Sequence, residues 1–229
     1  MSNVPLTGVQ ACVFDAYGTL FDFASAAKSC RDVLGEAIDT LTALWRDKQL
    51  QYTWLRALEG RHADFWQVTS DALDFALETL ALDKPGLRDR LMNLYLTLEP
   101  FPEVPDVLAR LKKAGMRTAI LSNGSPAMLD AVVQASRLGM LIDAVFSVEA
   151  VGVYKPHPKV YQLAVDHLQL LPLRIGFVSS NAWDAIGAKA FGLTSIWVNR
   201  TGVPIDRHGP APDAMIESLI ELPALVREA

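Results

Sequence analysis

The chain has 229 residues, of which 51% are hydrophobic, and a formal net charge of −5 at pH 7. This length and apolar content suffice for a substantial core, in one large domain or in a domain that carries an insertion. The net negative charge gives no indication of nucleic-acid binding, and no run of basic residues indicates binding to a membrane surface. No uncharged apolar stretch reaches the ~20 residues of a membrane span.

The cysteines and the first residues indicate a cytoplasmic protein. The chain has two cysteines, Cys12 and Cys30. They suggest no disulfide framework, which fits a reducing compartment. The segment Met1–Gln10 lacks the charged and apolar regions of a signal peptide.

The first predicted strand carries the most informative residue. The apolar run Ala11–Phe14 ends on Asp15, and a turn with Gly18 follows at once. A buried strand of this kind delivers a carboxylate to the open end of a parallel sheet. A second acid two residues later would suggest a metal site or a proton donor, but Tyr17 stands there. The sequence therefore indicates that Asp15 is a nucleophile that works without a second acid.

The next segment is predicted to be helical from Asp22 to about Leu98. Apolar residues recur at helical spacing over residues 39–58, 63–80 and 85–98, and Pro85 suits the first turn of the last helix. Three prolines within residues 99–105 then mark a boundary.

Beyond this boundary, strands and helices alternate. Helices are predicted over 105–114, from Ser125-Pro126 onward, over 158–168 and 183–191, and at the C-terminus; strands are predicted over 117–121, 144–148, 175–179, 194–198 and 214–216. The alternation predicts an α/β fold with a doubly wound, mainly parallel, Rossmann-like sheet. Residues 1–21 and 99–229 would form this core domain. Residues 22–98 would form an inserted helical cap over the strand ends, which creates a closable cleft.

Four segments place polar groups just past strand ends, so we expect them to meet at one rim of the sheet. They are Asp15 with Thr19, Ser122-Asn123, Lys155, and residues 179–184. A helix N-terminus, a hydroxyl and a lysine together form a receptor for a phosphate or a carboxylate.

In this order, the motifs resemble the haloacid dehalogenase superfamily. They are Phe-Asp-Ala-Tyr-Gly-Thr-Leu (14–20), Leu-Trp-Arg (44–46), Ile-Leu-Ser-Asn-Gly (120–124) and Phe-Val-Ser-Ser-Asn-Ala-Trp-Asp (177–184). Phosphatases of that superfamily carry a second aspartate where Tyr17 stands, and usually Gly-Asp in the last segment. The chain therefore resembles, over nearly its whole length, the L-2-haloacid dehalogenase branch.

The resemblance implies hydrolysis of small L-2-haloalkanoic acids to D-2-hydroxy acids, through a covalent aspartyl ester with inversion at C2. It implies no metal and no other cofactor. The implied partner is a small 2-halocarboxylate, and relatives are commonly homodimers.

The resemblance also assigns roles to the nucleophile and the residues around it. Asp15 would be the nucleophile, and Thr19 would fix its rotamer. Lys155 would keep Asp15 ionised, since a nearby cation favours a carboxylate, and Tyr161 would support Lys155. Ser122 and the backbone N–H groups after Asp15 would hold the substrate carboxylate.

Further roles concern the leaving group and water. Arg46 and Asn123 would stabilise the departing halide. Asp184, positioned with Ser179 and Asn181, would activate or orient water.

The remaining assignments concern the pocket wall and Arg46. The pocket would be walled by Tyr17, Leu50, Phe65 and Trp183. An arginine on a helix usually lies on the solvated face, so the role assigned to Arg46 rests on the resemblance alone. Asp47, where relatives commonly have glutamine, either weakens anion binding by Arg46 or points to water. The other tryptophans are interpreted as packing residues: Trp45, Trp54, Trp66 and Trp197.

Three alternatives remain open at this stage. A metal-dependent phosphatase of the same superfamily would need a second acid and Mg²⁺, and Tyr17 speaks against it. A non-catalytic carboxylate-binding protein would keep ligand affinity but show no turnover. A fluoride-releasing haloacetate dehalogenase would need tight donors near Arg46 and Asn123, and comparing fluoroacetate with chloroacetate would separate it.

Overall fold

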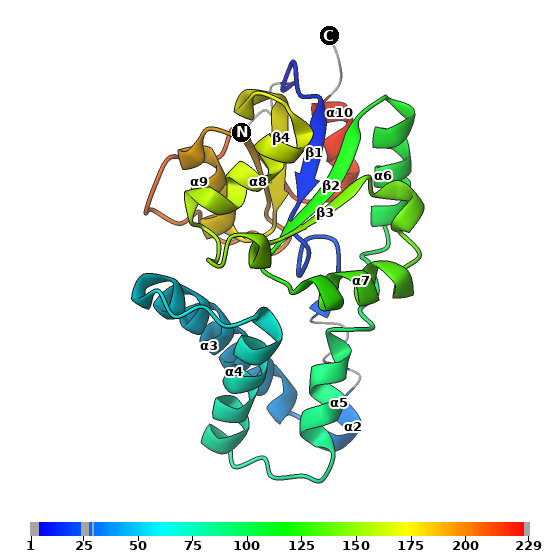
Figure 1. The fold of residues 1–229 in the computed structure, drawn as a ribbon. Helices are drawn as coiled ribbons and strands as arrows, with labels where there is room; N and C mark the ends of the chain where they lie inside the picture. Colours follow the sequence, from blue (N-terminus) through cyan, green and yellow to red (C-terminus); the bar gives the residue numbers. More distant parts are fainter. Residues whose placement is uncertain (1–4, 24–27, 29, 227–229) are drawn as a thin grey trace.

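The computed structural model describes residues 5–23, 28 and 30–226, and within them six parallel strands form one sheet (Figure 1). In chain order the strands are β1 (Ala11–Phe14), β2 (Arg117–Ser122), β3 (Ala144–Ser147), β4 (Ile175–Ser179), β5 (Thr194–Val198) and β6 (Ala214–Ile216). Their order in the sheet is β3-β2-β1-β4-β5-β6, so β1 lies between β2 and β4. The predicted α/β fold with a doubly wound parallel sheet is confirmed.

The central strands are buried along their whole length because helices cover both faces of the sheet. Every residue of β1, β4 and β5 is buried, as expected of interior parallel strands. Helices α6 (Val104–Lys113) and α10 (Leu222–Leu225) lie on one face, and α8 (Pro158–Leu168) and α9 (Ala182–Phe191) lie on the other (Figure 1). Helix α7 (Pro126–Ala135) begins as predicted, because the Ser125 hydroxyl accepts the Met128 N–H.

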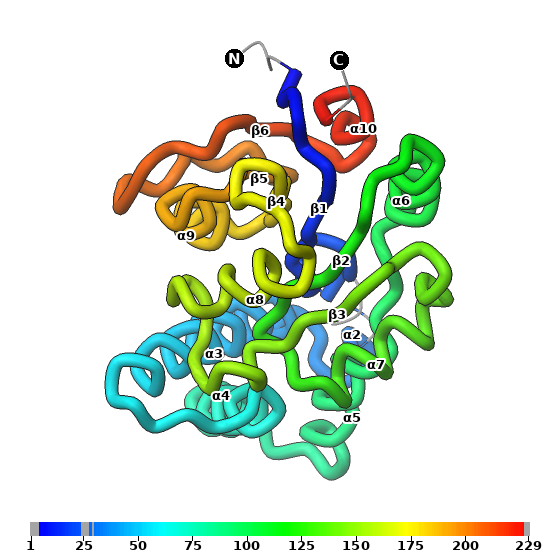
Figure 2. The backbone as a smooth tube through the Cα atoms, turned by 45° about the horizontal axis from the view of Figure 1, so that its top comes forward, coloured from blue at the N-terminus to red at the C-terminus, as the bar shows by residue number. Residues whose placement is uncertain are grey.

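Among the residues that the structure describes, four helices intervene between β1 and α6. They are α2 (Arg31–Leu34), α3 (Ala37–Glu59), α4 (Phe65–Thr79) and α5 (Leu87–Leu94). Figures 1 and 2 show them gathered at the end of the sheet toward which β1 points. Helices α3 and α4 pack together, and the Trp45 indole of α3 donates to the Thr69 carbonyl of α4 at 2.8 Å. The strand ends that carry the predicted site therefore face a helical layer.

Two local predictions in this layer are wrong. Pro85 is not in the first turn of a helix, because α5 begins at Leu87 and Gly86 before it has a positive φ of 75°. This backbone conformation is incompatible with a continuous helix from Pro85. The same helix ends at Leu94 rather than Leu98.

Some expectations concern residues outside those described. Residues 24–27 and 29 belong to the region predicted to be helical after Asp22, and residues 1–4 belong to the N-terminal segment. In the part of the chain that is described, no helix has the length and apolar character needed to cross a membrane.

Candidate active site

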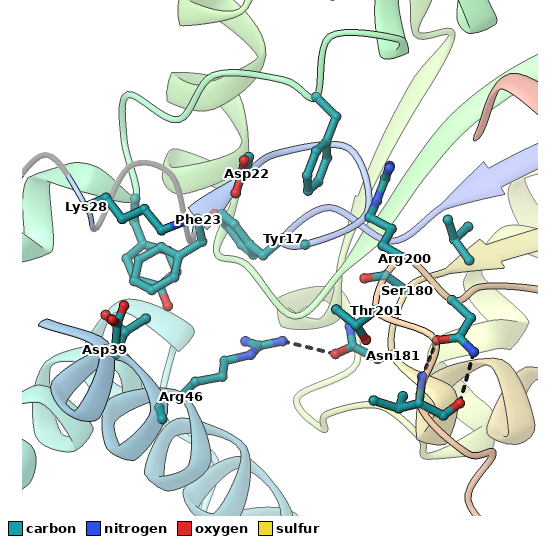
Figure 3. A pocket seen from close by; sticks show the side chains of 18 of the residues that line it. Tyr17, Asp22, Phe23, Lys28, Asp39, Arg46, Ser180, Asn181, Arg200 and Thr201 are labelled. Atoms are coloured by element: carbon teal, nitrogen blue, oxygen red, sulfur yellow. Dashed lines mark hydrogen bonds between the residues drawn. The ribbon is translucent and has the colours of Figure 1, made fainter. Parts of the chain in front are cut away.

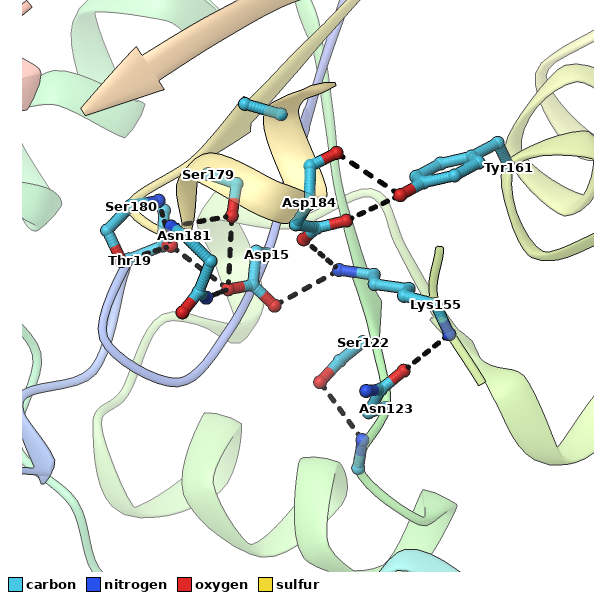
Figure 4. Close-up of polar contacts among 12 residues, drawn as sticks. Asp15, Thr19, Ser122, Asn123, Lys155, Tyr161, Ser179, Ser180, Asn181 and Asp184 are labelled. Carbon is cyan, nitrogen blue, oxygen red and sulfur yellow. Dashed lines mark hydrogen bonds and ion pairs between the residues drawn. The ribbon is translucent and has the colours of Figure 1, made fainter. Parts of the chain in front are cut away.

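The predicted segments meet at the carboxyl ends of the strands (Figure 4). Asp15 follows β1, Ser122 ends β2 and Ser179 ends β4. Lys155 reaches them from the loop before α8, and the Lys155–Pro156 peptide bond is cis. The convergence that the sequence predicted is therefore present in the fold.

A tight turn after β1 brings Thr19 back to Asp15. Gly18 has a φ of 85°, and a Cβ at this position would lie 3.2 Å from the Ser180 hydroxyl oxygen. Glycine is the residue that tolerates both the conformation and the close approach. The turn places the Thr19 hydroxyl 3.1 Å from Asp15 Oδ2 and 3.1 Å from Ser180 Oγ, while Thr19 Oγ1 accepts the Ser180 N–H.

The two oxygens of the Asp15 carboxylate have different surroundings. Oδ2 accepts from Asn181 Nδ2 at 2.9 Å, from the Thr19 hydroxyl at 3.1 Å and from the Ser179 hydroxyl at 3.4 Å. Oδ1 lies 3.1 Å from Lys155 Nζ. The carboxylate is thus held in one orientation, with Oδ2 saturated by donors and Oδ1 against a cation.

Lys155 joins two carboxylates inside the protein. Its Nζ lies 3.1 Å from Asp15 Oδ1 and 2.9 Å from Asp184 Oδ2, and its side chain is 1% exposed. Burial acts to lower the pKa of Lys155, but the carboxylates of Asp15 and Asp184 outweigh it and the pKa is raised. Lys155 is therefore a fixed cation at physiological pH.

Lys155 lies between Asp184 and Asp15. Asp184 is not grouped with Ser179 and Asn181, whose side chains contact Asp15 instead. The Tyr161 hydroxyl donates to Asp184 Oδ1 at 2.8 Å, so its predicted support of Lys155 would act through Asp184. Burial raises the pKa of Asp184, although the Lys155 ammonium opposes this effect.

The Ser122-Asn123 segment contributes a hydroxyl group and a side-chain amide to the site. Ser122 is fully buried and its Oγ accepts the Gly124 N–H at 3.1 Å, which leaves the hydroxyl proton without an acceptor among the described residues. Asn123 Oδ1 accepts the Lys155 N–H at 3.1 Å, so its NH₂ is the end available to a ligand. Both groups are donors suited to an anion.

Arg46 reaches the site from α3. Its Nη1 donates to Gln49 Oε1 at 2.6 Å, and its Nη2 lies 3.5 Å from Asn181 Oδ1. Gln49 is fully buried and donates in turn to the Thr69 and Tyr95 hydroxyls. Sequence reasoning missed Gln49, although a polar residue three positions after Arg46 on a buried helix face was a usable signal.

Asp47 does not compete for the Arg46 guanidinium. Asp47 is exposed on α3, whereas Arg46 is partly buried and turned toward the core. Of the two readings left open by the sequence, the structure favours an acid that points to water.

The site encloses a very small cavity. Its volume of about 10 Å³ leaves room for about one water molecule. Its walls are Asp15, Tyr17, Arg46, Phe65, Ser122, Asn123, Lys155, Asn181 and Trp183. Leu50, predicted as a wall residue, is not among them. Admission of any larger molecule therefore requires a wall to move.

A larger cavity of about 600 Å³ adjoins the small one and shares Tyr17, Arg46 and Asn181 with it (Figure 3). In Figure 3, Arg46 extends from α3 toward Asn181 at the sheet edge. These polar side chains form the boundary between the two spaces.

No group of three or more His, Cys, Asp or Glu residues in ranges 5–23, 28 and 30–226 is arranged to hold a metal ion. The expectation that the reaction needs no cofactor stays a prediction.

Comparison with known proteins places the chain in a family. A family model for haloacid dehalogenase-like hydrolases matches residues 9–192. The chain belongs to this family.

Individual relatives of this haloacid dehalogenase-like hydrolase are similar over nearly their whole length. A protein of Pseudomonas sp. (strain YL) named (S)-2-haloacid dehalogenase is 47% identical, covering 92% of this chain and 91% of the relative. Another (S)-2-haloacid dehalogenase, from Burkholderia cepacia, is 45% identical and covers 93% of each chain. The family membership inferred from the sequence motifs is confirmed.

A solved structure shares the same architecture. It is the L-2-haloacid dehalogenase from Xanthobacter autotrophicus with chloropropionic acid covalently bound, with a TM-score of 0.87 and 39% identity, covering 95% of this chain and 98% of that one. The similarity extends over the sheet and the inserted helices, so this haloacid dehalogenase-like hydrolase has the fold of that enzyme.

Proposed function

We propose that the protein hydrolyses small L-2-haloalkanoic acids to D-2-hydroxy acids through an ester on Asp15. The observation that carries the proposal is the buried Asp15 carboxylate, with Oδ2 held by three donors and Oδ1 beside Lys155. The covalently bound chloropropionic acid of the similar Xanthobacter enzyme supports it.

In the first step, a lone pair of Asp15 Oδ1 attacks C2 of the substrate from the side opposite the halogen. The C–O bond forms as the carbon–halogen bond breaks, and the halide leaves with its electron pair, so C2 is inverted. A carboxylate is a better nucleophile when water is excluded, and the cavity has room for about one water molecule. Oδ1 attacks because Oδ2 is already occupied by donors.

The anionic parts of the substrate are bound by the donors around the cavity. Ser122 and the backbone N–H groups after Asp15 hold the substrate carboxylate. Arg46 and Asn123 stabilise the halide as its charge develops. The contact from Gln49 fixes the Arg46 guanidinium, which reduces the reorganisation needed during the step.

In the second step, water attacks the ester carbon of Asp15, so the configuration at C2 is retained from the first step. Negative charge develops on Oδ2, where Thr19, Ser179 and Asn181 already donate; these donors act as an oxyanion hole. Asp184 takes the proton of water, which its burial-raised pKa favours. The bond from the ester carbon to Oδ1 breaks, and the product alkoxide takes the proton that Asp184 received. The second proton of the water leaves Asp15 for the solvent, which restores both carboxylates.

We further propose that residues 22–98 act as a cap on the core formed by residues 1–21 and 99–229. The position of α2–α5 beyond the strand ends supports this division. A homodimer and a cytoplasmic location stay predictions.

Halide release from the two enantiomers of 2-chloropropanoate, with and without EDTA, tests the function. We expect chloride release from the L enantiomer, resistance to EDTA, and a D-2-hydroxy product. Release of phosphate from phosphate esters that depends on Mg²⁺, without chloride release, would support the phosphatase instead. Carboxylate binding without turnover would support the binding protein.

A further inference from the structure

The catalytic cavity must enlarge to hold a substrate, and two of its three apolar walls are fixed. Tyr17 and Phe65 are 5% and 1% exposed, and their rings stack at 6.0 Å. Tyr95 packs against Tyr17 at 5.2 Å, and Tyr154 packs against Phe65 at 6.1 Å. Phe65 is enclosed by these rings, and Tyr17, which also borders the 600 Å³ cavity, is held between the rings of Phe65 and Tyr95.

Trp183 is the third apolar wall, and it has space behind it. It is partly exposed in the first turn of α9, and it also lines a separate cavity of about 560 Å³. That cavity is bordered by Trp54, Ala57 and Leu58 of α3 and by Tyr154 and Lys155 of the core, together with Pro156, His157, Asp206 and His208. Movement of Trp183 would join the two spaces.

Trp54 borders the same cavity and contacts Trp183. Its ring meets the Trp183 ring edge to face, with centroids 5.5 Å apart and an interplanar angle of 84°. Trp54 is 37% exposed, so it packs against Trp183 at the surface rather than inside the core. Arg46, Leu50 and Trp54 follow at intervals of four residues on α3, so the helix directs the arginine and the tryptophan along one face.

We propose that Trp54 is a positioning residue that limits the chain length of the substrate by holding Trp183 between the catalytic cavity and the 560 Å³ cavity. This inference rests on the proposed function. The ligand of the 560 Å³ cavity is the alkyl chain on C2 of a longer 2-haloacid. The boundary with the 600 Å³ cavity is formed by Tyr17 together with Arg46 and Asn181, which are hydrogen-bonded to each other, so that cavity suits an alkyl chain less well.

The experiment compares kcat and KM for (S)-2-bromopropanoate and (S)-2-bromohexanoate in the wild-type protein and in variants of α3. In Trp54→Ala the ratio of kcat/KM for hexanoate over propanoate should rise at least about tenfold, since one methylene is worth about 10- to 200-fold in a fitted pocket. The gain should lie in KM for the hexanoate. Trp54→Phe, which keeps a ring edge, should restore a ratio near the wild-type value.

Leu58→Ala is the matched control, because Leu58 borders the same cavity but is 85% exposed and has no described ring contact with Trp183. If Trp54→Ala does not fold, Trp54→Leu replaces it, with the same direction expected. An unchanged ratio, an equal loss for both substrates, or an equal gain in Leu58→Ala would overturn the role of Trp54. If the wild-type protein released bromide from neither acid, the proposed function would fail and this inference with it.

Discussion

Asn in place of Asp15 is expected to lower kcat for halide release from (S)-2-chloropropanoate by at least about 10⁴-fold, because a carboxamide is a poor nucleophile. The substitution also removes one partner of a buried ion pair. The donors Thr19, Ser179 and Asn181 would face an amide in place of a carboxylate oxygen. Chloride release by the purified variant, with folding verified by circular dichroism, measures the effect.

Asp47→Asn is the matched control for this substitution. Asp47 is an exposed carboxylate beside Arg46, so the control changes the net charge equally without touching the cavity. We expect it to keep wild-type turnover. Loss of less than about 100-fold in Asp15→Asn would contradict the assignment of the nucleophile.

Methionine in place of Lys155 is expected to destabilise the protein by about 3–5 kcal/mol at pH 8 and to abolish most turnover. The substitution removes the cation 3.1 Å from Asp15 and 2.9 Å from Asp184, and it leaves two buried carboxylates without a counter-charge. Lys159→Met, at an exposed position of α8, serves as the control.

The loss of stability should depend on pH because of Asp184. Its pKa is raised in the folded protein even though Lys155 lowers it, so removing Lys155 raises the pKa further. A carboxyl group with a raised folded-state pKa binds more protons folded than unfolded, so stability falls as pH rises from the unfolded value of about 4 through the folded value. Urea unfolding at pH 4.5 and pH 8 should therefore give a smaller loss at pH 4.5. Equal losses at both pH values would contradict the account.

The sequence predicts the sheet better than it predicts the helical layer. Strands 175–179 and 194–198 have the predicted bounds, because short, largely apolar runs between turn signals leave little freedom in where a strand begins and ends. The predicted start of the helix at Pro85 is wrong because proline is common both in the first turn of a helix and one or two residues before it. The positive φ of Gly86, which decides between the two, is not visible in the sequence.

The sequence predicts that the polar groups of the site meet, but it does not predict which of them form pairs. Convergence follows from parallel strands, whose carboxyl ends share one edge. Pairing depends on the rotation of α9 about its axis, which sets Asn181 against Asp15 and Asp184 against Lys155. The roles of Gln49 and Trp54 depend on how α3 packs against the core, and this packing is a tertiary property.

A single turnover in ¹⁸O water with enzyme in excess tests the central claim most directly. With (S)-2-chloropropanoate, we predict a first-turnover product without label and a peptide containing Asp15 that is about 2 Da heavier. The product oxygen then comes from Asp15 Oδ1, and the water oxygen remains on the enzyme. Label in the hydroxyl group of the first-turnover product would mean direct attack by water on C2 and would contradict the ester mechanism.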